Sequence, residues 1–199
     1  MKLSKKGEYA LRTLIYLGLA AEEGRTLVRV SELAGNERIP GKFLEQIMQS
    51  LKEAGAVASV RGKFGGYRLA KPAREIRIGA IVRWIDGPLA PIACVSQTAY
   101  APCSCPDEDH CGLRMLMLDV RNAIAGILDR YTLGDVVDVT LRKLRRDGVT
   151  ATVARKSHPR PAGRAATRGS GRAAARRSRR RRLDVTDGVI HQLFEEYSI

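Results

Sequence analysis

The sequence predicts a mainly α-helical protein that carries one small β-hairpin, and three observations support this fold class. Apolar residues recur at spacings of three and four over most of residues 3–54, which is the period of a helix. A glycine-rich turn at 62–66 then separates two short β-prone segments. A second long stretch of helical periodicity begins at Gly112. Three helices followed by a hairpin predict a winged helix-turn-helix, here with a long helix beyond it.

The first predicted helix covers residues 3–21, with Ser4 as its N-cap and a broad apolar face. Residues 25–30 form a connector with the composition of a short strand. Ser31 then predicts the start of a short helix over 32–34, which Gly35 and Asn36 are expected to end.

The next helix is predicted to start at Pro40 and to stop before Gly55, where glycine commonly ends a helix. Residues 56–61 and 67–69 are the two strands of the predicted wing. Further helices are predicted over 78–85, from Gly112 onward and over 135–145. The third helix has one apolar face, made of Phe43, Leu44, Ile47, Met48 and Leu51.

An apolar seam runs along the long helix at alternating spacings of four and three. This heptad-like pattern predicts that another helical surface covers the seam. The protein's own head is one candidate for that surface, and a second copy of the chain is the other. We expect a homodimer, because a helix that extends from a small head commonly pairs with its twin. The seam consists of Leu113, Met117, Val120, Ile124, Ile127 and Tyr131.

Positive charge dominates the chain of 199 residues, whose formal net charge is +14. Twelve Lys and Arg residues and no acid lie between 155 and 182, whereas 183–199 carry four acids. A basic fold with a polycationic arm indicates a nucleic-acid partner. We expect 148–185 to be a disordered Arg-rich tail that adds salt-sensitive DNA affinity, and 186–199 to form a short amphipathic helix. A solvated tail without effect and a targeting or protein-binding tail are the alternatives.

Other classes of protein fit the sequence less well. No apolar run is long enough to span a bilayer and no signal-peptide cleavage site follows the N-terminus, so we expect a cytoplasmic protein with no membrane partner. The glycine-rich turn at 62–66 lies between strands and does not open a helix, so it is not a phosphate loop. No nucleophile–base motif is present either, and we expect neither an enzyme nor a small-molecule substrate.

Polar residues at the start of the third helix predict the DNA-reading surface. Lys42 suits phosphate or guanine, Gln46 suits adenine, and Glu45 accepts a hydrogen bond from cytosine. Arg61 and Lys63 at the wing, together with Lys2, Lys5 and Lys6 near the N-terminus, suit phosphates. Each of these charges is also consistent with an ordinary solvated surface, and the helical spacing of Phe43 predicts a core residue.

Four cysteines lie between 94 and 111, and the chain has no others. In a reducing compartment such clustered thiols indicate metal ligands or a redox switch more than structural disulfides. An iron–sulfur cluster, a zinc site and a cofactor-free thiol–disulfide switch are all compatible with them.

Three segments resemble one known family: MKLSKKGEYALRTLIYL at 1–17, FLEQIMQSLKEAGAVASVRGKFGGYRLA at 43–70, and a cysteine loop before a long helix. The chain resembles the Rrf2 family of winged-helix transcription regulators, which includes IscR, NsrR and CymR, over about residues 1–146. The resemblance implies a DNA-binding head at 1–88, a sensor loop at 89–111, and dimerisation and C-terminal helices at 112–147. It also implies recognition positions at Lys42, Phe43, Glu45 and Gln46, with Arg61 and Gly62 at the wing.

The resemblance further implies a cysteine-ligated iron–sulfur cluster of the 2Fe–2S or 4Fe–4S type. Family members with a cluster have three cysteines with five residues between neighbours. Cys105 and Cys111 keep that spacing, whereas ten residues lie between Cys94 and Cys105. These three are the expected ligands.

The fourth ligand is less direct, because Arg114 stands where some members have a histidine. Cys103, Glu8 from the partner subunit and His110 are the candidates. We expect a regulator, a repressor, that senses redox, nitric oxide or iron–sulfur status; the alternative is a cofactor-free regulator switched by thiol oxidation or a small ligand.

Overall fold

The structure is a computed structural model and describes residues 2–62 and 64–148. Lys63 and the predicted tail and terminal helix beyond residue 148 therefore lie outside the described residues. The helices are α1 (Lys5–Glu22), α2 (Val30–Glu37), α3 (Gly41–Glu53), α4 (Ile78–Asp86), α5 (Gly112–Arg130) and α6 (Leu133–Arg146). The strands are β1 (Val57–Val60) and β2 (Gly66–Leu69), and the short 3-10 helices are η1 (Ala73–Glu75) and η2 (Ala93–Val95).

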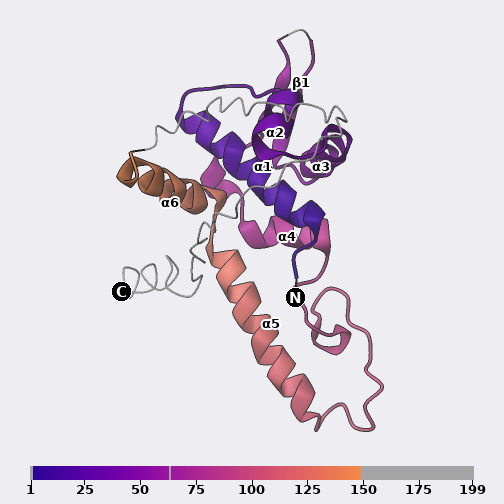
Figure 1. The fold of residues 1–199 in the computed structure, drawn as a ribbon. Helices are drawn as coiled ribbons and strands as arrows, with labels where there is room; N and C mark the ends of the chain where they lie inside the picture. Colours follow the sequence, from indigo (N-terminus) through magenta and orange to yellow (C-terminus); the bar gives the residue numbers. More distant parts are fainter. Residues whose placement is uncertain (1, 63, 149–199) are drawn as a thin grey trace, which may run out of the picture. The chain divides into compact units, whose positions relative to one another are not determined.

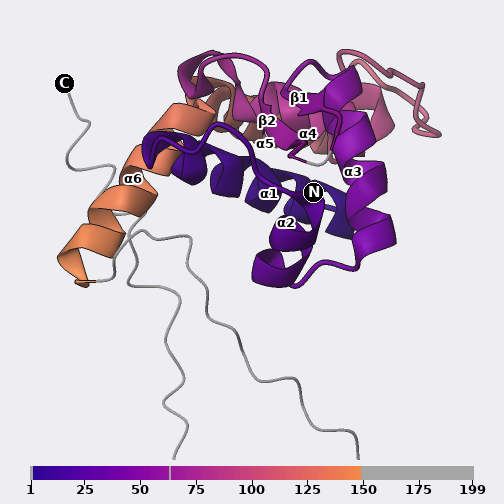
Figure 2. The ribbon, with the colours of Figure 1, turned by 90° about the horizontal axis from the view of Figure 1, so that it is seen from above.

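Helix α1 is the centre of the core. It contacts α2, α3, α4, α6 and β2, and Figure 2 shows it running between α6 at one end and α3 at the other. The apolar face predicted for the third helix lies against it, and Leu44, Ile47, Met48 and Leu51 are fully buried. Burial of these aliphatic side chains is the main force that holds the helices together.

The predicted wing is confirmed. Strands β1 and β2 pair antiparallel, with Val57 opposite Leu69 and Val60 opposite Gly66. The connector before α2 joins the hairpin, because Val28 and Tyr67 exchange backbone hydrogen bonds of 2.9 and 2.8 Å. A Cβ atom at Gly66 would lie 2.6 Å from the carbonyl oxygen of Val28, so glycine is required there. The three helices and this hairpin form the winged helix-turn-helix that the sequence predicts (Figure 1).

The prediction for α2 was wrong in its bounds and its cap. Arg29 is the N-cap and makes no side-chain cap hydrogen bond, so Ser31 lies inside the helix. The β-bridge between Val28 and Tyr67 keeps the backbone extended as far as Val28. The helix can therefore begin directly after Arg29, and Ser31 becomes a residue of its first turn. The helix ends at Arg38 in a left-handed conformation, φ 54°, and Gly35 is an interior residue.

Helix α6 begins two residues earlier than predicted because Thr132 caps it. The Thr132 hydroxyl accepts a hydrogen bond from the Asp135 backbone, and the Asp135 carboxylate accepts one from the backbone of Thr132, which is a capping box. The helix packs on α1, where a Cβ atom at Gly18 would lie 2.5 Å from Val137. The core of the head therefore includes α6.

Helix α5 has no buried residue. It packs on α4 and η2, and Ile124 and Leu128 lie against the core. Of the predicted seam, Leu113 is 57% exposed, Ile127 43% and Val120 36%, so one chain leaves half of the seam residues exposed. Neither α5 nor any other helix in the described part of the chain is apolar over a length that would cross a membrane.

Candidate functional site

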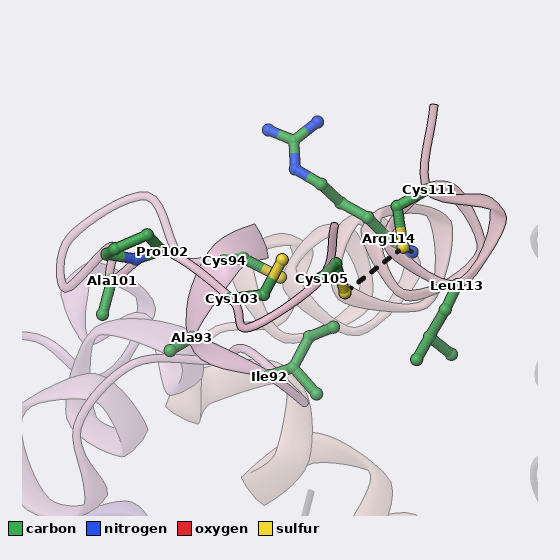
Figure 3. A pocket seen from close by; sticks show the side chains of 10 residues that line it. All are labelled: Ile92, Ala93, Cys94, Ala101, Pro102, Cys103, Cys105, Cys111, Leu113 and Arg114. Carbon is green, nitrogen blue, oxygen red and sulfur yellow. Dashed lines mark hydrogen bonds between the residues drawn. The ribbon is translucent and has the colours of Figure 1, made fainter. Parts of the chain in front are cut away.

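All four cysteines line one cavity of about 200 Å³ at the start of α5. Figure 3 shows their side chains together with the apolar residues Ile92, Pro102 and Leu113 and the single cation Arg114. The lining residues include no carboxylate and no imidazole. Three elements supply the thiols: η2, the loop that follows it, and the N-cap of α5.

Cys111 is the N-cap of α5, and its sulfur accepts a hydrogen bond from the backbone N–H of Arg114 at 3.4 Å. This hydrogen bond at a helix N-terminus lowers the pKa of Cys111. The Cys105 sulfur lies 3.8 Å from that of Cys111. Hydrogen bonds with the Cys103 and Cys111 thiols raise the pKa of Cys105 to about 12. The two thiols therefore differ in reactivity.

Cys94 is the most deeply placed of the four, at 4% exposure. Burial, and then the neighbouring Cys103 thiol, raise its pKa. The four sulfurs thus form a chain of neighbours that runs from Cys94 through Cys103 and Cys105 to Cys111 (Figure 3). Within the described ranges, no three His, Cys, Asp or Glu side chains surround a common point closely enough to hold a metal ion.

The other predicted ligand candidates do not line this cavity. Glu8 lies on α1, where it pairs with Lys5 at 2.7 Å and with Arg12 at 3.6 Å. His110 is bonded through Nδ1 to Asp107 at 2.7 Å. Arg114, in the position of a family histidine, contributes a cation to the cavity wall.

Glu108 ties the cysteine loop to α5, which the sequence did not indicate. Its carboxylate accepts hydrogen bonds from the Tyr100 hydroxyl at 2.9 and 3.0 Å. The same carboxylate forms an ion pair with Arg114, whose Nε lies 3.2 Å away. The Nε–H of Arg114 is not aligned for a hydrogen bond. The loop conformation and the first turn of α5 are therefore linked through one carboxylate.

The last turn of α4 connects α5 to the rest of the head through polar contacts. Arg83 makes a bidentate ion pair with Asp129 near the end of α5, with both N···O distances 2.6 Å. Trp84 donates from Nε1 to the carbonyl oxygen of Ser50 on α3 at 3.0 Å. Asp86 accepts hydrogen bonds from the backbone and hydroxyl of Ser4, at 2.8 and 2.5 Å.

Two glycines, Gly7 and Gly79, leave room for the Asp86 and Asp129 contacts. In the sequence, these two glycines are the feature that indicates a close approach at these points. A Cβ atom at Gly79 would lie 2.0 Å from Asp129, and one at Gly7 would lie 2.4 Å from Asp86. A helical glycine in an otherwise regular pattern indicates such a close approach.

The predicted DNA-reading residues occupy an exposed face. Lys42, Glu45 and Gln46 are exposed on α3, as are Arg61 and Gly62 at the wing. Phe43 is instead half-buried, with its ring 5.9 Å from that of Tyr9, as its spacing predicted. Of the N-terminal lysines, Lys2 before α1 and Lys5 in its ion pair with Glu8 are exposed, and Lys6 is half-buried.

The comparisons with known proteins agree with this architecture. The Rrf2 family, described as "Iron-dependent Transcriptional regulator", matches residues 3–139. An rrf2-like HTH-type transcriptional regulator of Rhodobacter capsulatus is 39% identical over 137 residues, which cover 68% of this chain and 91% of that protein. The HTH-type transcriptional regulator IscR of Serratia proteamaculans is 33% identical, over 69% of this chain and 80% of its own. The solved structure of CymR, the global cysteine regulator of B. subtilis, superposes with a TM-score of 0.58 at 29% identity, over 70% of this chain and 98% of that chain.

Proposed function

We propose that this chain, which belongs to the Rrf2 family of transcriptional regulators, represses transcription as a homodimer whose affinity for double-stranded DNA depends on an iron–sulfur cluster at its cysteine loop. The signal is a change in redox, nitric oxide or iron–sulfur status. The observation that carries the proposal is the convergence of four thiols on one cavity at the first turn of α5. We assign residues 1–88 to DNA binding, 89–111 to sensing, and 112–147 to dimerisation and the C-terminal helices.

The donor set fits an iron–sulfur cluster. Soft thiolates select iron–sulfur clusters and zinc over hard cations such as magnesium. The remaining cavity wall is apolar apart from Arg114, which suits an anionic thiolate-ligated group. The family description, iron-dependent, supports iron over zinc.

Cys94, Cys105 and Cys111 are the proposed ligands, and Cys103 is the proposed fourth. Cys103 lines the same cavity, whereas Glu8 from a second copy would first have to leave its pairs with Lys5 and Arg12. When bound, a cluster supplies reversible one-electron chemistry. The chain's own part is to hold the thiols in a largely apolar wall and to join them directly to a helix.

The coupling to DNA runs through α5 and α4. A rearranged loop displaces Cys111 and Glu108, and both contact the first turn of α5. When α5 moves, its Asp129 pulls on Arg83 and so moves α4. The hydrogen bond from Trp84 to Ser50 then transmits the movement of α4 to α3. A dimer reads half-sites about one helical turn of DNA apart, so a small change in the tilt of α3 alters affinity.

Absorption spectroscopy of anaerobically reconstituted full-length protein tests the cluster. We expect visible charge-transfer bands with bound iron and sulfide, and their absence in Cys94→Ala. Cys103→Ser should lose the bands while Glu8→Gln keeps them; the opposite pattern transfers the fourth-ligand role to Glu8. Colourless, iron-free wild-type protein after reconstitution rejects the cluster. A promoter–reporter assay with the gene deleted tests repression, since expression from target promoters should rise.

One distance favours a second candidate function, a cofactor-free thiol switch. The Cys105 and Cys111 sulfurs are 3.8 Å apart, and a disulfide would bring them to about 2 Å. The two thiols would give two protons and two electrons to a peroxide as the S–S bond forms. Hydrogen peroxide would be reduced to two water molecules, and an alkyl hydroperoxide to one alcohol and one water molecule. Peptide mapping of peroxide-treated, iron-free protein would reveal a Cys105–Cys111 linkage if this candidate is correct.

A further inference from the structure

A positively charged groove separates the exposed face of α3 from the wing. Arg29, Lys52 and Arg61 line it together with the polar residues Gln49 and Ser59, and its volume is about 410 Å³. None of the described residues that line it is Asp or Glu. A groove with three cations and no carboxylate attracts an anionic chain, and on a DNA-binding head that chain is the phosphodiester backbone.

The wing beyond this groove ends in an exposed aromatic ring. Phe64 is 77% exposed, more than any other large hydrophobic side chain among the described residues. The backbone N–H of Gly65 donates to the carbonyl oxygen of Gly62 at 2.9 Å, which closes the turn that presents Phe64. A Cβ atom at Gly65 would lie 2.2 Å from the carbonyl oxygen of Val60, so the turn cannot accept a larger residue there without opening.

The order of these features matches the order of features across a DNA duplex. Moving sideways from the major groove across one phosphate strand leads to the minor groove. On the protein, α3 supplies Gln49 and Lys52 to the cationic groove and the wing supplies Ser59 and Arg61, so the groove lies between α3 and the wing. With α3 in the major groove and a phosphate strand in the cationic groove, the wing tip lies over the minor groove.

Single exposed apolar residues are common on protein surfaces and usually have no role. Phe64 differs in position, because the turn that presents it borders a cationic groove on a DNA-binding head. Apolar side chains at such positions pack on sugars or enter between base steps of the minor groove.

We propose that Phe64 is a DNA-contact residue that packs against the deoxyribose and base edges of the minor groove while Arg29, Lys52 and Arg61 hold the intervening phosphates. The inference rests on the proposed DNA binding and adds a contact that carries no charge. Its energy is therefore independent of salt, unlike that of the cations beside it.

Fluorescence anisotropy at several KCl concentrations tests this with the full chain and a duplex that the wild-type protein selects from a random-sequence pool. Phe64→Ala should weaken binding about tenfold, from the loss of one buried aromatic contact, with the salt slope unchanged. Phe64→Leu, which keeps apolar area, should recover most of the affinity. Arg61→Gln should lower the salt slope by about one.

Arg68 provides the matched control for charge, because it lies on the same hairpin but lines a different cavity with Leu17 and Ala21. Arg68→Gln should leave affinity and slope near those of the wild type. Distamycin, a minor-groove ligand, should compete with the wild type more strongly than with Phe64→Ala.

The inference is overturned if Phe64→Ala binds like the wild type, or if its loss of affinity is accompanied by a changed salt slope. Either result leaves the proposed function intact as long as the wild-type protein selects a duplex. Failure of the wild type to select any duplex instead rejects DNA binding itself.

Discussion

Replacing Asp129 by Asn should weaken the coupling between the cysteine site and DNA without preventing folding. Asp129 lies near the end of α5 and forms a bidentate ion pair with Arg83 of α4. Asn is nearly isosteric, so it preserves the close approach at Gly79 while it removes the charge. The change therefore loosens the joint through which α5 is proposed to act on the head.

The geometry of the pair sets the magnitude. The Arg83 and Asp129 side chains are 33% and 47% exposed, and pairs this exposed contribute roughly 0.2–1 kcal/mol. Two aligned hydrogen bonds of 2.6 Å put this pair at the upper end, at about 1 kcal/mol. A free energy of about 1 kcal/mol corresponds to roughly a fivefold change in an equilibrium constant.

The assay measures Kd for DNA with anaerobically reconstituted and with metal-free protein, and takes the ratio of the two. For Asp129→Asn we expect the two Kd values to become more alike, so that their ratio changes by up to roughly fivefold in the direction of one. Asp138→Asn is the matched control, because it breaks an Arg–Asp contact of the same 2.6 Å length between α6 and Arg74, away from α5. It removes one contact of a more exposed pair, so it should cost no more stability than Asp129→Asn and leave the ratio unchanged.

Two results would refute this reasoning. If Asp129→Asn and Asp138→Asn change the ratio equally, the effect is a general loss of stability. If neither changes it although the wild-type ratio differs from one, the signal reaches α3 by another route.

Three further predictions concern the fold, the thiols and the tail. Gly7→Ala places a Cβ 2.4 Å from Asp86 and should lower the free energy of unfolding by about 1–3 kcal/mol. Gly35→Ala is the control: a Cβ there meets no atom within 4 Å, so the free energy of unfolding should stay unchanged or rise by about 0.5–1 kcal/mol. Urea titration of each variant measures these changes. In reduced, metal-free protein the lowered pKa of Cys111 leaves a larger fraction of it as thiolate than of Cys105, whose pKa is about 12. Iodoacetamide should therefore label Cys111 before Cys105 between about pH 6 and about pH 9. Mass spectrometry that finds Cys105 labelled first would contradict this. Truncation after Ala154 removes twelve Lys and Arg residues and should lower the salt slope of DNA binding, while an unchanged slope would show that the tail does not contact phosphates.

The head could be predicted because its signals are local. Apolar spacing located α1, α3 and α4, and the glycines around residues 62–66 located the wing. The failure at α2 has a non-local cause, since the pairing of Val28 with Tyr67 fixes where that helix begins. The early start of α6 was readable in principle, because Thr132 and Asp135 have capping-box spacing.

The candidate site was only partly readable. Comparison with the family's cysteine spacing suggested that Cys94 is a displaced ligand and Cys103 an extra thiol. Both line the same cavity as Cys105 and Cys111, because the loop folds back on itself. No spacing rule predicts such a return. The pairing of Arg83 with Asp129 joins residues 46 positions apart, and neither position is distinctive in the sequence.

The position of Cys111 restricts how a signal can travel. As N-cap it stabilises only the first turn of α5, typically by about 1 kcal/mol, and fraying of that turn would not extend through a helix of 19 residues, about 28 Å long. The helix must therefore move as a rigid body. Such motion acts first on α4 and η2, because α5 packs on these two elements and has no fully buried residue. In the proposed dimer, the exposed seam would turn each such motion into a change of angle between the two heads.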